Sequence, residues 1–199
     1  MGRKPVGWRV AIVGAGGIGF DVAEYLANGS DLGHASPTTD LPTWLREWGV
    51  ADPAAARGGV VPPRPEPAAR EVMLLQRKPG KPGASLGKTT GWIHRAALKQ
   101  RNVSMLSGLN YERIGGVDAP GSEASGVGLF ITFGEDHRDG TVLAVDTIVL
   151  CAGQEPLREL LAPLQAAGVK LHLIGGALEA GELDAKRAID QGTRLAASL

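Results

Sequence analysis

Short apolar runs recur along the chain between polar, glycine-rich or proline-rich segments, a pattern that predicts a series of buried β-strands. In the first half these runs alternate with stretches in which apolar residues recur at helical spacing. The order β-α-β-α-β is typical of a parallel sheet covered by helices. The strands expected here are residues 8–13, 71–78 and 103–106, with one helix after the first strand and another at residues 89–101.

The second half has a different pattern, in which strands follow one another across turns rich in glycine and aspartate. This pattern predicts an antiparallel meander, with Asp139-Gly140 as one of its turns. The expected strands are residues 109–114, 127–133 and 141–145, followed by a buried strand at 146–150. Beyond them we expect a helix or crossover at 157–167, a strand at 169–174 and a last helix from about Glu182.

The first strand runs directly into glycines spaced Gly-x-Gly-x-x-Gly, at Gly14, Gly16 and Gly19, with Gly17 between them. Gly14 allows a sharp turn off the strand, and Gly16 leaves room where a pyrophosphate must approach the backbone. Gly19 lets the following helix lie close to the strand. Amides at the start of that helix would then face phosphate, so the segment predicts a dinucleotide-binding site.

Ile18, Val22 and Leu26 recur every four residues and predict the apolar stripe with which this helix covers the sheet. Together these features predict an α/β fold: a Rossmann-like parallel sheet with an antiparallel β-meander, followed by a C-terminal strand and helix. An ordinary tight glycine turn is the alternative. The strand before the glycines and the helix after them favour the dinucleotide site.

Residues 28–70 lie where such a fold needs only a short connection, so we interpret them as an insertion. Seven of the thirteen prolines fall in this stretch, which predicts extended or irregular backbone for much of it. Leu41, Trp44, Leu45 and Trp48 have helical spacing and predict one short helix. Core packing that anchors the insertion to the sheet is the interpretation we favour for these side chains.

The insertion displaces the residue that selects the cofactor. An acidic residue about 20 positions after the glycines would indicate NAD, and counting alone nominates Asp40. Asp40, however, follows no apolar strand, whereas the second strand leads into Arg77 and Lys78. Two cations at that position would pair with an adenosine 2′-phosphate, which favours NADPH. Solvated loop charges remain the alternative.

Residues 81–90 approach a second phosphate-binding motif, the Walker A loop. Gly87, Lys88 and Thr89 match it, but Pro82 occupies the place of the first glycine and no strand leads into the loop. We therefore interpret Thr89 or Thr90 as the cap of the next helix. Lys88, close to that helix start, is expected to contact a cofactor phosphate.

Composition narrows the functional classes. The 21 basic and 21 acidic residues leave no net charge that would indicate nucleic acid or a membrane surface as a partner. The start of the chain resembles neither a signal peptide nor a membrane span, which favours a cytoplasmic location. Cys151 is the only cysteine, so we interpret it as a small apolar residue, and the four scattered histidines show no metal-ligand spacing.

Several strings resemble the C-terminal part of bacterial NADPH-dependent 2,4-dienoyl-CoA reductases, multidomain flavoproteins of the old-yellow-enzyme type. The matching strings are Gly-Gly-Ile-Gly-Phe-Asp (16–21), Glu-Trp-Gly (47–49), Gly-Lys-Thr-Thr-Gly-Trp-Ile-His-Arg (87–95), Cys-Ala-Gly-Gln-Glu-Pro (151–156), His-Leu-Ile-Gly-Gly (172–176) and Glu-Leu-Asp-Ala-Lys-Arg-Ala-Ile (182–189). Members of that family carry an FMN barrel, an iron–sulfur cluster and an FAD domain into which an NADPH domain is inserted. They reduce dienoyl-CoA esters in fatty acid β-oxidation.

The resemblance implies that residues 1–153 are the NADP(H)-binding Rossmann domain and that residues 154–199 are a crossover and return segment of an FAD domain. Gly153 would then lie near the nicotinamide ribose. The FAD site would be shared with sequence outside this chain, and the barrel and the iron–sulfur cluster would belong entirely to that sequence. The positions implied to contact FAD are Gly175, Gly176, Ala177, Leu183 and Asp184.

The sequence is compatible with two hypotheses about the function of the chain. One is the NADPH-binding part of a flavin-dependent oxidoreductase, which positions NADPH for hydride transfer to FAD when a flavin-domain or barrel partner completes it. The other is a freestanding NADPH-binding module without turnover. The C-terminal strand and helix favour the first, because a self-sufficient module needs no flavin-domain segment. No residue of this chain is expected to act as a catalytic acid or base.

Overall fold

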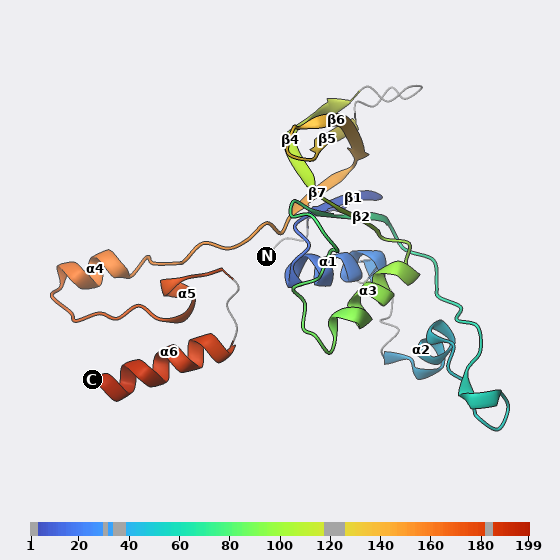
Figure 1. The fold of residues 1–199 in the computed structure, drawn as a ribbon, viewed down its shortest axis with the longest axis horizontal. Helices are drawn as coiled ribbons and strands as arrows, with labels where there is room; N and C mark the ends of the chain where they lie inside the picture. Colours follow the sequence, from blue (N-terminus) through green and yellow to red (C-terminus); the bar gives the residue numbers. More distant parts are fainter. Residues whose placement is uncertain (1–3, 30–31, 34–38, 118–125, 182–184) are drawn as a thin grey trace. The chain divides into compact units, whose positions relative to one another are not determined.

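The structure, a computed structural model, describes residues 4–29, 32–33, 39–117, 126–181 and 185–199 (Figure 1). The chain divides into two compact units, Met1–Ala152 and Gly153–Leu199, and each is described here by itself. In the described part, no helix is both long and apolar enough to cross a membrane.

A four-stranded parallel sheet forms the centre of the first unit. Its strands are β1 (Arg9–Val13), β2 (Glu71–Gln76), β3 (Ser104–Ser107) and β7 (Thr147–Leu150), in the order β3-β2-β1-β7. Val10 lies beside Val72 on one side and Thr147 on the other, so β1 is paired along both edges. The predicted Rossmann-like sheet is confirmed, because every pair of neighbouring strands is parallel.

Two helices, α1 (Gly17–Ala27) and α3 (Gly91–Gln100), cover one face of this sheet (Figure 1). The predicted apolar stripe of α1 is confirmed at Leu26 and in part at Val22, but it is wrong at Ile18. Phe20, Ala23 and Leu26 are buried, whereas Ile18 is 53% exposed. The stripe therefore follows the i, i+3, i+6 positions that begin at Phe20. The reason is that the close approach of Gly19 to the first turn fixes which side of the helix meets the sheet.

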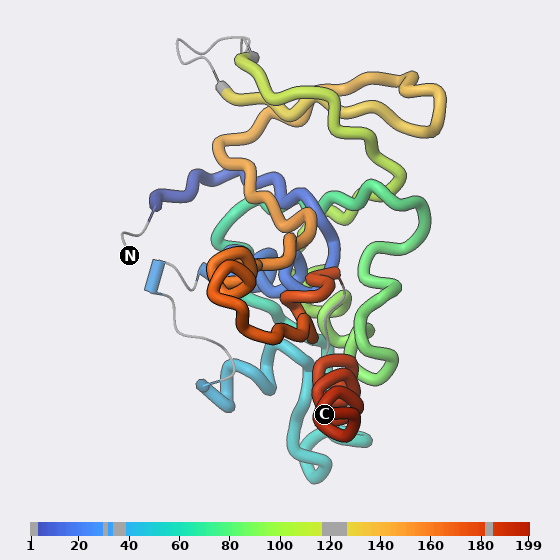
Figure 2. The backbone as a smooth tube through the Cα atoms, turned by 90° about the vertical axis from the view of Figure 1, so that its left-hand side faces the viewer, coloured from blue at the N-terminus to red at the C-terminus, as the bar shows by residue number. Residues whose placement is uncertain are grey.

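The predicted antiparallel meander is confirmed as a second sheet of β4 (Leu109–Val117), β5 (Gly126–Phe133) and β6 (Arg138–Val145), which appears in Figure 2 as the looped strands above the first sheet. It packs on the other face of the parallel sheet. Val10 and Ile12 join the cluster beneath the helices, whereas Ala11 and Val13 join Leu129 and Ile131. The two-residue period of β1 separates these two cores.

The turn predicted at Asp139-Gly140 lies several residues earlier in the structure, so its predicted position is wrong. Residues 134–137 form the turn, and Asp139 lies within β6 with φ +55°. A shift in pairing register between Ile131 and Phe133 accommodates the difference. Such a shift lets an extra residue bulge from the hairpin, which the turn signal alone could not reveal.

The insertion contains the expected helix, α2 (Leu41–Trp48), and a short 3₁₀ turn, η3 (Arg57–Gly59). The predicted core packing of its apolar residues is wrong in part, since Leu41 is 65% exposed and Trp44 36%. The buried residue of α2 is Glu47, whose carboxylate pairs with Arg101 at 2.7 Å. A buried ion pair to the residue that ends α3, rather than apolar contact with the sheet, attaches this helix.

The second unit holds three helices in its described residues, α4 (Leu161–Ala166), α5 (Gly175–Leu178) and α6 (Ala185–Ser198). The strand expected at residues 169–174 is not formed, although the apolar pattern is present. A strand needs a neighbour to accept and donate its backbone hydrogen bonds, and the described part of this unit supplies none. Arg158 instead caps α5 by donating to the carbonyl oxygens of Ala177 and Leu178.

Candidate functional site

The loops that follow the parallel strands meet at one edge of the sheet, where α/β proteins bind their ligands. Backbone hydrogen bonds connect these loops to one another. The Gly14 amide donates to the Leu75 carbonyl at 2.9 Å, and the Cys151 amide donates to the Val13 carbonyl at 2.7 Å. The glycine turn after β1 therefore lies between the ends of β2 and β7.

Two of the glycines are required by packing. Gly14 has φ +112°, and a Cβ there would collide with the carbonyl of Cys151. A Cβ on Gly19 would collide with the carbonyl of Gly14 and approach Leu74 to 3.4 Å. These contacts match the tight turn and the close packing of helix against strand that the spacing predicts.

The other two glycines border open space. A Cβ on Gly16 or Gly17 would meet no described atom within 4 Å, so packing within the first unit does not require glycine at either position. Gly16 precedes α1, and its carbonyl accepts the first helical hydrogen bond from Phe20 at 3.1 Å. The amides before Phe20 have no acceptor within the helix and carry the positive end of its dipole. Open space in front of such amides suits a phosphate group.

Arg77 and Lys78 follow β2 directly, and both are exposed. The turn that contains them is stabilised by hydrogen bonds from the Gln76 side chain, which donates to the carbonyls of Lys78 at 2.9 Å and Gly80 at 3.4 Å. Sequence reasoning missed Gln76, although a polar residue at the end of a buried strand was a usable signal. Asp40, by contrast, precedes α2 and accepts a hydrogen bond from the Thr43 hydroxyl at 2.6 Å.

Tyr111 is a second residue that the sequence did not single out. Burial raises the pKa of this phenol, and the charge of Arg77 partly opposes that rise. Its hydroxyl oxygen is buried and has no hydrogen-bond partner among the described residues. Tyr111 packs against the core on the meander side of the parallel sheet.

The segment around Lys88 does not form a phosphate loop. The amides of Ala84, Leu86 and Thr90 donate to carbonyls of the same segment, so these amides do not point toward a phosphate. Lys88 is exposed three residues before α3. Thr90 is the N-cap residue of α3, as expected, although its hydroxyl makes no capping hydrogen bond in the described residues.

Cys151 follows β7 beside the glycine turn and is half-buried against the core below α1. Burial raises the pKa of its thiol, which disfavours the reactive thiolate. Gly153, with φ +128°, begins the second unit, and a Cβ there would meet no described atom within 4 Å.

In the second unit, the Gly175 amide donates to Gln191 Oε1 at 2.7 Å. Gly175, Gly176 and Ala177 belong to the short helix α5. The other two positions implied to contact FAD, Leu183 and Asp184, lie outside the described residues.

Comparison with solved structures shows the same fold in several oxidoreductases. A 2-naphthoyl-CoA reductase in complex with 2-naphthoyl-CoA matches 98% of this chain at 14% identity and a TM-score of 0.58. Histamine dehydrogenase from Rhizobium sp. 4-9 matches 96% at 13% identity and 0.55, and the HOCl-induced flavoprotein disulfide reductase RclA from Escherichia coli matches 99% at 14% identity and 0.53. The chain spans 22%, 23% and 37% of these proteins, respectively.

A family model gives the closer assignment. The model described as pyridine nucleotide-disulphide oxidoreductase matches residues 2–179, which include the glycine turn, both sheets and the start of the second unit. Proteins of this family are oxidoreductases that bind FAD and pyridine nucleotides. The chain therefore belongs to the pyridine nucleotide-disulphide oxidoreductase family.

Proposed function

We propose that this chain binds NADPH and positions it for hydride transfer to FAD, as part of a flavin-dependent oxidoreductase that sequence outside the chain completes. The observation that carries the proposal is the contrast within the glycine turn. Gly14 and Gly19 are fixed by packing, whereas Gly16 and Gly17 face open space at the N-terminus of α1. Glycines that the fold itself does not need are best explained by a ligand that approaches the backbone closely.

In this proposal the amides beyond Gly16 donate to the pyrophosphate, and the dipole of α1 stabilises its charge. Arg77 and Lys78 pair with the 2′-phosphate, which distinguishes NADPH from NADH. Lys88 supplies a further cation for a phosphate oxygen. The Gln76 side chain donates to carbonyl oxygens of the turn that carries Arg77 and Lys78. These hydrogen bonds fix the backbone from which the two cationic side chains extend.

When bound, NADPH supplies a hydride and FAD accepts it, so the chemistry belongs to the cofactors. The chain's own part is to hold and orient. Gly153 has a backbone conformation that L side chains rarely adopt, and it follows the end of β7, where the nicotinamide ribose is proposed to lie. No described group is needed to move a proton.

The second unit would contact FAD through Gly175, Gly176 and Ala177, together with Leu183 and Asp184. The Gly175 amide already donates to Gln191, so a flavin oxygen at that amide has to displace the Gln191 side chain. We infer that the chain alone holds FAD weakly and that a flavin-domain or barrel partner provides most of the flavin site.

The finer assignment is a 2,4-dienoyl-CoA reductase acting in fatty acid β-oxidation in the cytoplasm. It is supported by the family-like strings at residues 87–95 and 151–156, together with those of the second unit. A freestanding NADPH-binding module is the second candidate. It is favoured by the first unit's own two cores, which enclose the sheet without any residue of the second unit.

The direct test is a titration of the full chain with NADPH and with NADH, followed by nicotinamide fluorescence. We expect NADPH to bind at least about tenfold more tightly, the usual effect of one charge-assisted phosphate contact. Equal affinities would remove the proposed role of Arg77 and Lys78. Addition of FAD, at a concentration high enough to offset its weak binding, and of an artificial electron acceptor then separates the two candidates, because only the oxidoreductase part reduces the acceptor.

A further inference from the structure

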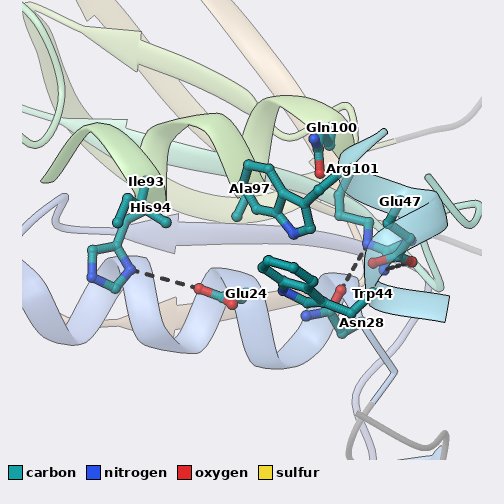
Figure 3. A pocket seen from close by; sticks show the side chains of 10 residues that line it. Glu24, Asn28, Trp44, Glu47, Ile93, His94, Ala97, Gln100 and Arg101 are labelled. Atoms are coloured by element: carbon teal, nitrogen blue, oxygen red, sulfur yellow. Dashed lines mark hydrogen bonds and ion pairs between the residues drawn. The ribbon is translucent and has the colours of Figure 1, made fainter. Parts of the chain in front are cut away.

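A cavity of about 180 Å³ lies between α1, α2 and α3, on the outer side of the helical layer. Its lining comes from the second half of α1, from both tryptophans of α2 and from α3 (Figure 3). The glycine turn is at the opposite end of α1, so this cavity is separate from the proposed nucleotide site. The residues used below are Glu24, Trp44, Glu47, Trp48, His94 and Arg101.

Two indoles give the cavity its shape. The rings of Trp44 and Trp48 are 6.3 Å apart at their centroids and tilted by 38°. Trp44 keeps 36% of its surface exposed, although an indole of this size normally gains from full burial. A tilted pair of aromatic faces beside a charge is the arrangement that attracts organic cations.

The charged side chains around the cavity determine whether a cation or an anion can bind there. The Arg101 guanidinium is engaged on several sides, donating to Glu47 Oε1 at 2.7 Å, to Asn28 Oδ1 at 2.7 Å and to the Glu66 carbonyl. Arg101 therefore neutralises Glu47 and has little capacity left for an anion.

Glu24 is the carboxylate of the lining that has no guanidinium or ammonium partner among the described residues. Among the described residues its ion-pair partner is His94, at 3.7 Å, which is longer than a hydrogen bond. In Figure 3 the Glu24 carboxylate lies between the His94 ring and the Trp44 indole. Apart from the Arg101–Glu47 pair, the lining therefore holds one carboxylate and one imidazole beside two aromatic faces.

We propose that this cavity binds a compact alkylammonium ion, with its charge between Glu24 and the indoles of Trp44 and Trp48. The cavity volume of about 180 Å³ leaves room for a group of trimethylammonium size. A neutral apolar ligand would bury the carboxylate without a partner, and an anion would be repelled by it.

The test uses choline as the probe and 3,3-dimethyl-1-butanol, its uncharged isostere, as the matched ligand. The indole N–H signals of the full chain are followed by NMR in both titrations, at constant chloride concentration. We expect saturable shifts for Trp44 and Trp48 with choline, no such shifts for Trp8 and Trp92, and at least about fivefold weaker binding of the alcohol. Equal binding of the two ligands, or no saturable shift, overturns the proposal.

Substitutions test which side chains of the cavity bind choline. Glu24→Gln preserves the shape of the side chain and should weaken choline binding at least about fivefold, whereas Asp21→Asn removes an exposed carboxylate from the same helix and should change nothing. Trp44→Leu should also weaken binding, with Trp92→Leu as its control. If Trp44→Leu does not fold, Glu24→Gln still tests the proposal, and unchanged affinity in that variant overturns it.

Discussion

Glu47 of α2 and Arg101, the C-cap residue that follows α3, form an ion pair of 2.7 Å, with only 5% and 9% of their side chains exposed. This contact joins the insertion to the Rossmann-like unit across 54 residues of sequence. Breaking it leaves a charge in a site that water barely reaches, and that charge costs more than the pair gained by forming.

We therefore expect Arg101→Met to lower the free energy of unfolding by about 3–5 kcal/mol, because Glu47 then lacks its partner. Chemical denaturation followed by tryptophan fluorescence measures the change. Arg194→Met removes an exposed pair with Asp190 and is the control, with an expected change within about 0.5 kcal/mol. A small effect at Arg101 would mean that the apolar contacts of α2 hold the insertion instead.

Gly16→Ala separates binding from folding. The open space around Gly16 and its φ of −83° accommodate a methyl group, so stability should stay within about 0.5 kcal/mol. NADPH affinity should fall at least about tenfold, because the methyl group occupies the space proposed for the pyrophosphate. Gly116→Ala, at an equally open position on β4, is the matched control, and its affinity should not change.

Arg77→Ala and Lys78→Ala should each weaken NADPH binding by about tenfold while leaving NADH binding nearly unchanged. The reason is that only NADPH carries the 2′-phosphate. Parallel fluorescence titrations with both nucleotides measure the preference. Lys99→Ala, which removes a charge from α3 near its C-terminal end, should alter neither affinity. A uniform loss for both nucleotides would place the two cations at the pyrophosphate.

Tyr111→Phe should leave stability unchanged or raise it by up to about 1 kcal/mol, because it removes a buried hydroxyl that lacks a hydrogen-bond partner among the described residues. Thermal or urea unfolding measures this directly. Tyr25→Phe, at a residue with 49% of its surface exposed, gives the baseline for the same change. A clear loss of stability in Tyr111→Phe would show that the hydroxyl has a partner in solution.

Acid should weaken the contact between β1 and the start of β7. Hydrogen bonds from the Arg9 side chain and backbone hold the pKa of Asp146 below its usual 3.8. The unfolded chain therefore takes up this proton first as the pH falls, so the contribution is present above about pH 4 and lost below it. In Asp146→Asn the acid-induced loss of stability between pH 5 and about pH 2 should be smaller. An unchanged profile would assign the acid sensitivity to other carboxylates.

The parallel sheet and the glycine turn could be predicted from the sequence because their signals are local. Apolar runs identify strands, and the spacing of Gly14, Gly16 and Gly19 fixes a turn between strand and helix. The position of Arg77 and Lys78 also followed from the sequence, since the residues after a parallel strand must lie at the ligand edge.

Other features depend on contacts between distant residues. Ile18 has the spacing of a buried stripe, yet the approach of Gly19 to the Gly14 carbonyl turns it toward solvent. From the sequence alone, Glu47 would be expected to be an exposed charge. The structure buries it because its carboxylate pairs with Arg101. Residues 169–174 have the composition of a strand, but a strand exists only where a neighbour completes its hydrogen bonds.

The sequence by itself determined the order of the parallel strands and helices of the first unit, the glycine turn after β1 and the two cations after β2, because each depends on a few consecutive residues. Only the tertiary structure decided which face of α1 is buried, how the insertion is attached and that a cavity with two indoles lies beneath it. These features arise from packing and from the pairing of buried charges, which join residues that the chain keeps far apart.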